Sequence, residues 1–418
     1  MALMQNLLTR LLALGRAKPN PTGQGRGYGM RSTSGRRVTH SQAELVSVVW
    51  ACMDALAAPM ASSDWNVYAG RRHGNKKTTQ PDSDLQFVLN TRFNEEMTAQ
   101  SGKRALMLAA VSYGYGIAEI GRNLANRINA LYPLHPDRVE PHRDLDTGEL
   151  FFRVTNQLGA TVDIKQEDVF IIRGPGLSGF VGDDMVAKAV QSIAIALAQD
   201  EFTNSYYSNG AQLGGTLTFP KNLSDTQYER LKEQFDEKHM GARNANKWAI
   251  VEGGGSVTPF NHDAQKAQIV DAKYVTIEDI CRFFRVPPHK VAHLLRATNN
   301  NIEHQGLEFT GDSLRPWKVE IEQEADYKLV PWRSQQFIEI DLDWAQQGDY
   351  ASRAQAYQSL RECGVFTAND VLRKLGENTI GPEGDVHTIN SAAIPLKDVG
   401  KNLAPTTTPP KPPSKGTP

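Results

Sequence analysis

The sequence predicts an α+β protein in which long helices flank a region of short strands. Apolar residues recur at three- and four-residue steps over residues 41–61 and 183–208, as expected of amphipathic helices. Between them, residues 110–173 change to short apolar and aromatic runs separated by Gly, Pro, Asp and Asn, which is typical of strands and turns. A second, smaller group of strand and helix signals lies at 210–261, between two helical segments.

Composition places the chain among ordinary globular proteins and limits its partners. Its 418 residues leave room for two or three domains at roughly 150 residues each. Lys and Arg total 46 and Asp and Glu total 47, so the chain lacks the basic excess of proteins that wrap DNA. No apolar run approaches the roughly 20 residues of a membrane span. The three cysteines are far apart and form no CxxC pair, which favours a reducing compartment and argues against a zinc site.

The two ends of the chain differ from the middle. Residues 1–40 contain seven Arg and Lys residues, no Asp or Glu, and many Gly, Pro and Ser residues, so we expect a basic flexible arm. Such an arm is either a solvated tail or a contact for an acidic partner or nucleic acid. Residues 396–418 are rich in Pro, Thr and Lys, and we expect them to be disordered.

The first half of the chain predicts helices packed on a small sheet. Ser41 is a good cap for a helix over 41–61 that Pro59 would end. Residues 65–68 predict a strand, and residues 84–89 and 92–108 predict helices. Further strands are expected at 115–120, 130–132, 138–140, 150–154 and 169–172.

The second half predicts long helices around a small insert. Over 183–208 an apolar stripe runs along one side of the helix, and it packs either on a neighbouring subunit or within the same chain. The insert has the pattern β-α-β-β over 210–261, and a helix over 263–285 follows until Pro287 and Pro288. Residues 302–329 predict a third long helix, kinked at Pro316. The stripe consists of Val186, Val190, Ile193 and Leu197.

Motifs of catalysis are missing from the sequence. No GxxxxGK[ST] phosphate-binding loop occurs, and GPGLSG at 174–179 lacks the spacing of a nucleophile elbow, so a turn is the better interpretation. His289 and His293 are four residues apart, but Lys290 stands where a zinc protease needs Glu. We therefore predict no catalytic residue, no metal site and no cofactor.

Seven phrases, in order along residues 47–329, resemble one protein family. They are SVVWACMDALAAPMASSDW, LYPLHPDRVEP, DVFIIRGPGLSGFVGDDMVAKAVQSI, SNGAQLGGTLTFPKNLSDTQYERLKEQF, VTIEDICRFFRVPPHKVA, ATNNNIEHQGLEF and LRPWKVEIEQEADYKL. Together they are similar to portal proteins of tailed bacteriophages, in the compact long-tailed-phage family of the Hong Kong phage type. The cluster Asn299, Asn300 and Asn301 with His304 departs from relatives, which often have Ser-Asn and Gln there.

The resemblance implies a portal fold with named parts. Residues 1–40 would be the arm and 41–182 a mixed α/β wing. The paired stem helices would be 183–209 and 263–285, with a small β-α-β-β clip at 210–262 between them. A tunnel loop at 286–301 would lead into a long kinked helix at 302–348, which returns to the wing through a strand at 337–342, and 349–395 would be a helical crown before the tail at 396–418. Members of the family form a closed ring, usually of twelve subunits, at one capsid vertex.

The resemblance also implies partners and a location. Double-stranded DNA would pass through the ring during packaging and ejection. The clip would meet the large terminase subunit and afterwards head-completion or adaptor proteins, and the ring would contact the major capsid protein. We expect the protein in the host cytoplasm during assembly and in the virion afterwards, without a membrane.

Sliding DNA requires weak contacts, so modest positive charge and uncharged polar residues are expected along the channel. Either the acidic residues of the 302–329 helix repel a centred duplex, or they pair with a neighbour's basic groups. The asparagines of the tunnel loop either touch DNA or form a simple connector. The predicted tunnel-loop residues are Lys290, Arg296, Thr298, Asn299, Asn300 and Asn301, and the predicted stem lining is Lys266, Lys273, Arg282 and Arg285.

Two other functions are weighed against a phage portal. The same ring could serve in a prophage remnant or a gene-transfer particle, which the sequence alone does not separate from a phage. A DNA-processing enzyme would need a phosphate-binding loop or a metal-binding set of carboxylates, and the sequence offers neither.

Overall fold

The structure is a computed structural model with two compact units, Met1–Gln346 and Gln347–Pro418. It describes residues 30–388 except 71, 73–77, 81–82, 144–148, 157, 178, 180, 209–214, 219–255, 260–262, 295–304, 332–333, 343–349 and 376. In the described residues, no helix is both long and apolar enough to cross a membrane.

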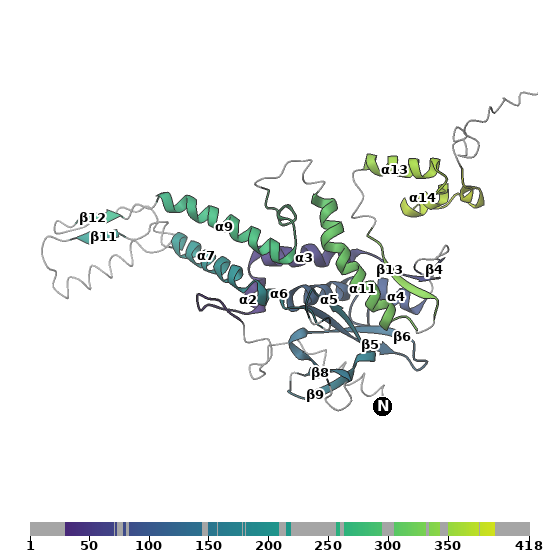
Figure 1. Cartoon of the computed structure of the whole chain (residues 1–418), viewed down its shortest axis with the longest axis horizontal. Coiled ribbons are helices and arrows are strands. Elements are labelled where there is room, and N and C mark those ends of the chain that lie inside the picture. Colours follow the sequence, from purple (N-terminus) through teal and green to yellow (C-terminus); the bar gives the residue numbers. More distant parts are fainter. Residues whose placement is uncertain are drawn as a thin grey trace, which may run out of the picture. The chain divides into compact units, whose positions relative to one another are not determined.

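An antiparallel sheet, β10-β5-β6, lies at the centre of the first unit (Figure 1). Residues of β5 alternate between two covered faces, because side chains alternate along a strand. Ala118 and Ile120 join the main core under the helices, whereas Tyr115 and Ile117 join a second core on the other face. The strands are β5 (Tyr115–Arg122), β6 (Ile128–Leu134) and β10 (Val169–Arg173).

A second antiparallel sheet, β7-β8-β9, covers the lower face of the central one. Phe152, Val154 and Ile164 of this sheet are buried against the second core. The sheet includes one strand that the sequence pattern did not predict, β9, whose side chains are mostly exposed and therefore lack an apolar signal. Its strands are β7 (Val139–Arg143), β8 (Leu150–Thr155) and β9 (Thr161–Lys165).

Helix α5 (Ala99–Tyr113) covers the upper face of the central sheet, and the antiparallel helix α3 (Ser47–Ser62) packs on α5. Close packing between α5 and β5 depends on Gly116, because a Cβ there would collide with the backbone carbonyl of Leu106. The main core under these helices also includes Leu56 and Met107, both almost completely buried.

The first predicted helix is in fact two helices. Thr39, rather than Ser41, caps α2 (His40–Glu44) in a capping box with Gln42, and the chain turns before α3 begins. Pro59 lies inside α3, where Ser62 and Ser63 hydroxyls donate to its carbonyl oxygen and help to end the helix just beyond. The helix predicted over 92–108 begins only at residue 99, because Thr98 provides its cap.

A third sheet, β13-β3-β4, joins chain segments that are far apart in the sequence. The predicted strand at 337–342 forms as β13 (Gln336–Ile340) and pairs with β3 (Trp65–Ala69). The edge strand β4 (Thr78–Thr79) follows, and α4 (Asp84–Asn90) packs on β3. The pairing joins the strand predicted at 337–342 to the strand predicted at 65–68.

Lys103 of α5 is a charged residue in this core and is only 3% exposed. Its ammonium donates to the Ser63 carbonyl at 2.9 Å and to Asn90 at 3.2 Å, and it lies over the Trp65 ring. Burial lowers the pKa of Lys103 to about 8, and the charge of Asp64 offsets this only partly.

This shift predicts a pH dependence of stability. Between about pH 8 and 10.5 the unfolded chain keeps the Lys103 proton that the folded chain has lost, so stability should rise with pH by about 3 kcal/mol. Lys103→Met should abolish this rise, whereas Lys165→Met, at an exposed lysine, should keep it. Urea denaturation at pH 7.5 and at pH 10 measures the free energy of unfolding at each pH. An equal rise between the two pH values in both variants would contradict the attribution of the rise to Lys103.

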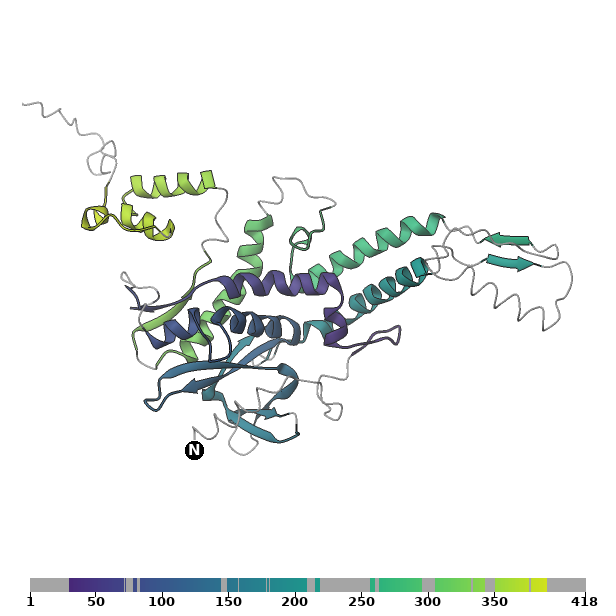
Figure 2. The same ribbon diagram turned by 180° about the vertical axis from the view of Figure 1, so that it is seen from behind.

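Two long antiparallel helices, α7 (Val190–Ser208) and α9 (Asp263–Phe284), lie side by side and extend away from the sheets (Figures 1 and 2). The helix predicted over 183–208 is interrupted at Ala189, which separates the short α6 (Met185–Lys188) from α7. Beyond the two helices, β11 (Gly215–Thr218) pairs with β12 (Ser256–Pro259). The rest of the predicted insert, including its helix, lies outside the described residues.

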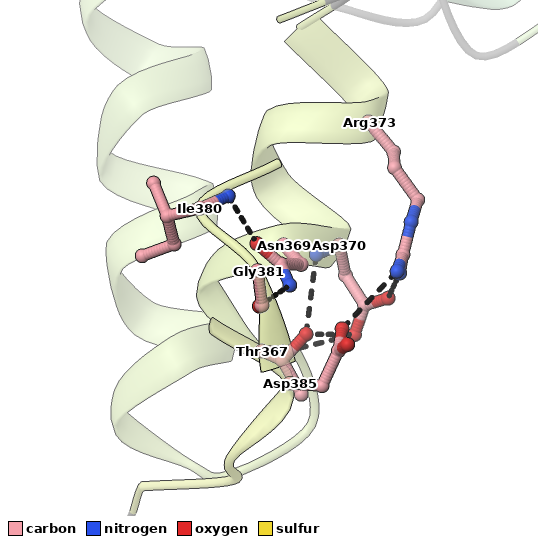
Figure 3. Close-up of polar contacts among 7 residues, drawn as sticks. All are labelled: Thr367, Asn369, Asp370, Arg373, Ile380, Gly381 and Asp385. Carbon is pink, nitrogen blue, oxygen red and sulfur yellow. Dashed lines mark hydrogen bonds and ion pairs between the residues drawn. The ribbon is translucent and has the colours of Figure 1, made fainter. Parts of the chain in front are cut away.

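The second unit contains α13 (Tyr350–Glu362), α14 (Ala368–Leu375) and a turn of 3₁₀-helix at Pro382–Asp385. Figure 3 shows how side chains fasten the segment after α14. Asn369, which is 1% exposed, donates to the Gly381 carbonyl at 2.7 Å and accepts the Ile380 N–H at 3.0 Å. Both helices of the predicted crown therefore form, and polar contacts hold its final turn.

Candidate functional site

The two long helices form a hairpin, and buried apolar side chains fill the space between them at its base. Ile193 on α7 and Ile280 and Phe284 on α9 are buried between the helices and α3. Polar contacts continue the pairing farther out, where Gln199 meets Thr276 at 3.2 Å. The hairpin is thus anchored in the main core at its base.

His40 ties the base of this hairpin to the N-terminal segment. Its ring lies 3.1 Å from the carboxylate of Asp184 and stacks on Tyr113, with ring centroids 3.8 Å apart. Asp184 also caps α6 by accepting the Ala187 N–H at 2.9 Å. The Asp184 carboxylate therefore joins α2 to α6, and the His40 ring joins α2 to α5.

The glycine-rich segment before α6 packs backbone against backbone. Gly174 and Gly182 both donate N–H groups to the carbonyl of Gly114, at 2.9 and 3.0 Å. Gly114 ends α5 in the left-handed conformation, with φ of 85°. This contact agrees with the interpretation of the GPGLSG phrase as a turn, since the glycines allow an approach that side chains would block.

The segment after α9 begins at Arg285, which has a positive φ of 55° and ends the helix before the two prolines. Ser313 holds this turn by donating its hydroxyl to the Arg285 carbonyl at 2.6 Å. A 3₁₀ turn at Pro288–Val291 follows, and the exposed Lys290 lies over the ring of Phe309, 5.5 Å from its centroid. Burial, and then the charge of Lys290, lower the pKa of His289.

The predicted kink at Pro316 corresponds to a change of helix type. A π-helix over Phe309–Leu314 precedes α11 (Arg315–Lys328), and the Arg315 N–H bonds to the carbonyl of Thr310, five residues back. Pro316 has no N–H and would leave an α-helical carbonyl without its donor, so the wider turn lies where the regular pattern cannot continue.

The acidic residues of α11 face the chain itself. Glu324 and Glu320 bind Arg173 of β10 at 2.7 and 3.3 Å. Burial alone would lower the pKa of Arg173, but hydrogen bonds and charge from these two carboxylates outweigh it and raise the pKa. The guanidinium therefore stays charged and joins α11 to the central sheet.

A second pair of carboxylates on α11 holds the third sheet. Glu322 and Asp326 each lie 2.7 Å from Arg72. The same carboxylates accept backbone N–H groups of β13, Asp326 from Ile338 at 2.7 Å and Glu322 from Ile340 at 2.8 Å. These four carboxylates thus have partners within the same chain, an arrangement that neither sequence alternative, repulsion of DNA or pairing with a neighbour, included.

The predicted stem lining is partly occupied by internal ion pairs. Lys273 binds Asp200 of α7 at 2.8 Å, and Arg282 pairs with Glu278 at 3.4 Å and with Asp279. Arg285 and Lys290 are exposed beyond the end of α9. Lys266 lies in α9 but its side chain is outside the described part, as are Arg296, Thr298, Asn299, Asn300 and Asn301.

The predicted apolar stripe belongs to the core of its own chain. Val186, Val190 and Ile193 are 4%, 9% and 0% exposed in the main core, and Leu197 packs against its edge. Of the two sequence alternatives, packing within the chain is the one that the burial supports. The first three residues offer no surface to a neighbouring subunit.

A metal-binding cluster is not found in the described part of the chain. No group of three or more His, Cys, Asp or Glu residues there is placed to hold a metal ion. Cys52 and Cys281 are buried together as free thiols, with sulfur atoms 3.8 Å apart, while Cys363 is exposed. The described part of the first unit consists of sheets and packed helices from which a helical hairpin projects (Figures 1 and 2).

Comparison with known proteins agrees with this arrangement. Residues 47–376 match the family described as phage portal protein. The chain belongs to the phage portal protein family. It is 28% identical to the portal protein of Enterobacteria phage HK97, over 86% of this chain and 85% of that one.

Two solved structures support the portal fold. The neck of an empty GTA particle with C6 symmetry has a TM-score of 0.58 at 18% identity, covering 84% of this chain and 96% of that one. The neck of a native GTA particle with C12 symmetry has a TM-score of 0.55 at 18% identity, covering 89% and 99%. The predicted portal fold of the α+β class is thus confirmed.

Sequence reasoning missed the residues that fasten this portal chain together. His40, Arg72 and Arg173 are single charged or titratable residues without a local motif, and their partners are more than 140 positions away. Only correlated substitutions at pairs of positions in related sequences would have indicated such contacts. The π-helix had a weak local signal, since Gly306 and Gly311 precede Pro316.

Proposed function

We propose that this chain forms a closed ring of twelve subunits at one capsid vertex, through which double-stranded DNA enters and leaves. The observation that carries the proposal is the family match over residues 47–376. The C12 symmetry of a neck with a similar subunit fold supports the subunit number. In this role the protein is structural and has no catalytic residue.

The segment after α9 is the best candidate for contact with DNA. Arg285 and Lys290 are exposed there, and the predicted loop with Arg296, Thr298, Asn299, Asn300 and Asn301 follows in the sequence. The net positive charge along α9 and this segment is modest, because Lys273 and Arg282 of α9 form ion pairs with acids of the same hairpin. Weak, non-specific contact suits a channel through which DNA must slide, since each phosphate neutralised adds affinity.

Partners follow from the position of each part in the ring. The insert at 210–262 would bind the large terminase subunit during packaging and head-completion or adaptor proteins afterwards, and the ring would be held by the major capsid protein. Assembly takes place in the host cytoplasm, and the finished ring lies in the virion.

Ring formation is tested by electron microscopy of the purified protein, together with its mass in solution. We expect closed rings with twelvefold symmetry. A persistent monomer at every protein and salt concentration would overturn the proposal, and a ring of another size would overturn only the subunit number.

Shortening the loop over 296–301 separates assembly from DNA handling. We expect the shortened protein to form rings normally, while particles that contain it package or retain DNA at least about tenfold less efficiently. The measurements are ring yield by electron microscopy and packaged DNA per particle. Loss of rings would show that the loop has a structural role, and normal DNA content would remove it from the channel mechanism.

A gene-transfer particle or a prophage remnant remains the alternative setting for the same ring. Likeness of fold does not separate these settings, because a solved phage portal protein and a chain from a GTA neck both share it. Sequencing the DNA from purified particles does so. A single phage genome supports a phage, whereas random fragments of the host chromosome support a gene-transfer particle.

A further inference from the structure

We propose that Cys52 and Cys281 form a redox-sensitive pair, which hydrogen peroxide oxidises to a disulfide that fastens α9 to α3. The pair lies where the helical hairpin joins the rest of the first unit, since α9 packs on α3 there. The inference goes beyond the proposed function and concerns the chemistry of the single chain, so it does not depend on a ring.

The two thiols lie side by side although 229 positions separate them in the sequence. Cys52 is 0% and Cys281 2% exposed, and their sulfur atoms are 3.8 Å apart. A disulfide bond is about 2 Å long, so the sulfurs need to approach each other by less than about 2 Å. Free cysteines often fill a core as small apolar residues, but such packing requires no second cysteine beside the first. Two adjacent sulfurs at a helix joint also allow a covalent bond to close.

Cys281 is the more reactive member of the pair. Its sulfur accepts a hydrogen bond from the Cys52 thiol, and this bond lowers the pKa of Cys281 although burial opposes it. The same hydrogen bond, together with burial, raises the pKa of Cys52. Because the thiolate is the nucleophile, Cys281 attacks the oxidant and Cys52 closes the disulfide.

A cavity brings a small oxidant close to both thiols. Its volume is about 230 Å³, and its walls include Leu56 of α3 and Phe284 of α9. Leu56 follows Cys52 by four residues and Phe284 follows Cys281 by three, so each wall residue lies one turn from a thiol on the same side of its helix. The volume far exceeds what one water molecule needs, and hydrogen peroxide is larger than water by a single oxygen atom.

The reaction has two steps and needs one molecule of hydrogen peroxide. The Cys281 thiolate attacks one peroxide oxygen, the O–O bond breaks, and the hydroxide that leaves takes up the thiol proton as water. Cys281 is then a sulfenic acid. The Cys52 sulfur attacks the sulfenic sulfur, the S–S bond forms, and the S–O bond breaks to release a second water. Two thiols thus lose two electrons and two protons in total, and the peroxide is reduced to two waters.

The disulfide would close the chain between positions 52 and 281 into a long loop, which restricts the unfolded chain strongly. One consequence rests on the proposed function. A particle leaves the reducing cytoplasm only after assembly, so the pair would stay reduced during packaging and would close in the released particle.

Counting thiols in the purified chain tests the pair directly. We would use Cys363→Ser protein, because Cys363 is exposed, and treat it with hydrogen peroxide under native conditions. The thiols alkylated after denaturation should fall from two per chain to almost none, and a reducing agent should restore them. Mass spectrometry of a non-reduced digest should find the peptides of Cys52 and Cys281 joined. Two remaining thiols, or thiols lost to sulfinic acid without a joined peptide, would overturn the proposal.

Single substitutions in the same background test the order of the steps. Cys52→Ala should leave Cys281 as a sulfenic acid that dimedone traps, whereas Cys281→Ala should leave Cys52 roughly tenfold less reactive. Equal trapping in both variants would contradict the assignment of Cys281 as the attacking thiol.

Thermal denaturation tests whether the bond fastens the helices. The oxidised pair should raise the Tm by at least about 5 °C over the reduced protein, and peroxide should produce no rise in either single variant. A disulfide without this rise would show that the bond does not hold α9 to α3. All these measurements use the isolated chain, so their failure would leave the proposed ring intact, and absence of rings would leave the pair intact.

Discussion

Replacing Glu322 by alanine is expected to lower the free energy of unfolding by about 3 kcal/mol. The carboxylate has only 7% side-chain exposure, and it binds both Arg72 and the backbone N–H of Ile340. Its removal leaves a buried N–H without an acceptor and Arg72 with one carboxylate fewer, and both losses cost free energy because little water reaches the site. Urea denaturation followed by tryptophan fluorescence measures the change.

The matched control is Glu308→Ala, which removes the same side chain from an exposed position before the π-helix. It should change the free energy of unfolding by no more than about 0.5 kcal/mol. Equal effects of the two substitutions would show that the carboxylate of Glu322 is not an internal clamp. A small effect of Glu322→Ala alone would mean that water replaces its hydrogen bonds.

This clamp links the proposed DNA contact to the wing. Ser313 in the π-helix holds the turn at Arg285, and α11 continues from the π-helix to the ion pairs with Arg173 and Arg72. A force on the segment after α9 would therefore be transmitted through α11 to two sheets, β10-β5-β6 and β13-β3-β4. The contacts of α11 with both sheets are charged and directional. A helix held only by apolar packing could slide more easily, because dispersion contacts lack direction.

Much of this fold could be predicted from the sequence because its signals are local. Strand β5 and the helix at 263–284 follow from periodicity, and Pro316 marks the place where the helix changes type. Helix boundaries were less predictable, as the capping role of Thr39 in place of Ser41 shows, since neighbouring hydroxyl residues have nearly equal capping preference.

The roles of the helix faces could not be predicted in the same way. Periodicity shows that Val186, Val190 and Ile193 share a face, but burial within the chain and burial against a neighbour need the same apolar residues. The acids of α11 present the same problem, because a sequence does not show that Arg72 and Arg173 lie beside them. Only the three-dimensional arrangement distinguishes an internal partner from an external one.

Of the two substitutions Gly114→Ala and Gly159→Ala, the first is expected to lower the free energy of unfolding much more. Gly114 has φ of 85°, where a Cβ costs about 1–2 kcal/mol, and that Cβ would also lie 2.6 Å from the Asp183 carbonyl oxygen and against the Gly182 backbone. Since backbone cannot move aside as a flexible side chain can, the segment that leads into α6 must shift. We expect the free energy of unfolding to fall by at least about 4 kcal/mol, or the protein to become insoluble, with loss of rings in either case.

Gly159→Ala separates backbone strain from the collision. Gly159 has φ of 83°, nearly the same as Gly114, but a Cβ there would meet nothing within 4 Å. Its substitution should therefore cost only about 1–2 kcal/mol and leave ring yield unchanged. Equal thermal stability of the two variants would contradict the argument, because strain alone would then account for both. If Gly114→Ala is much less stable than Gly159→Ala, the close backbone contact at Gly114, and not its positive φ alone, accounts for the loss of stability.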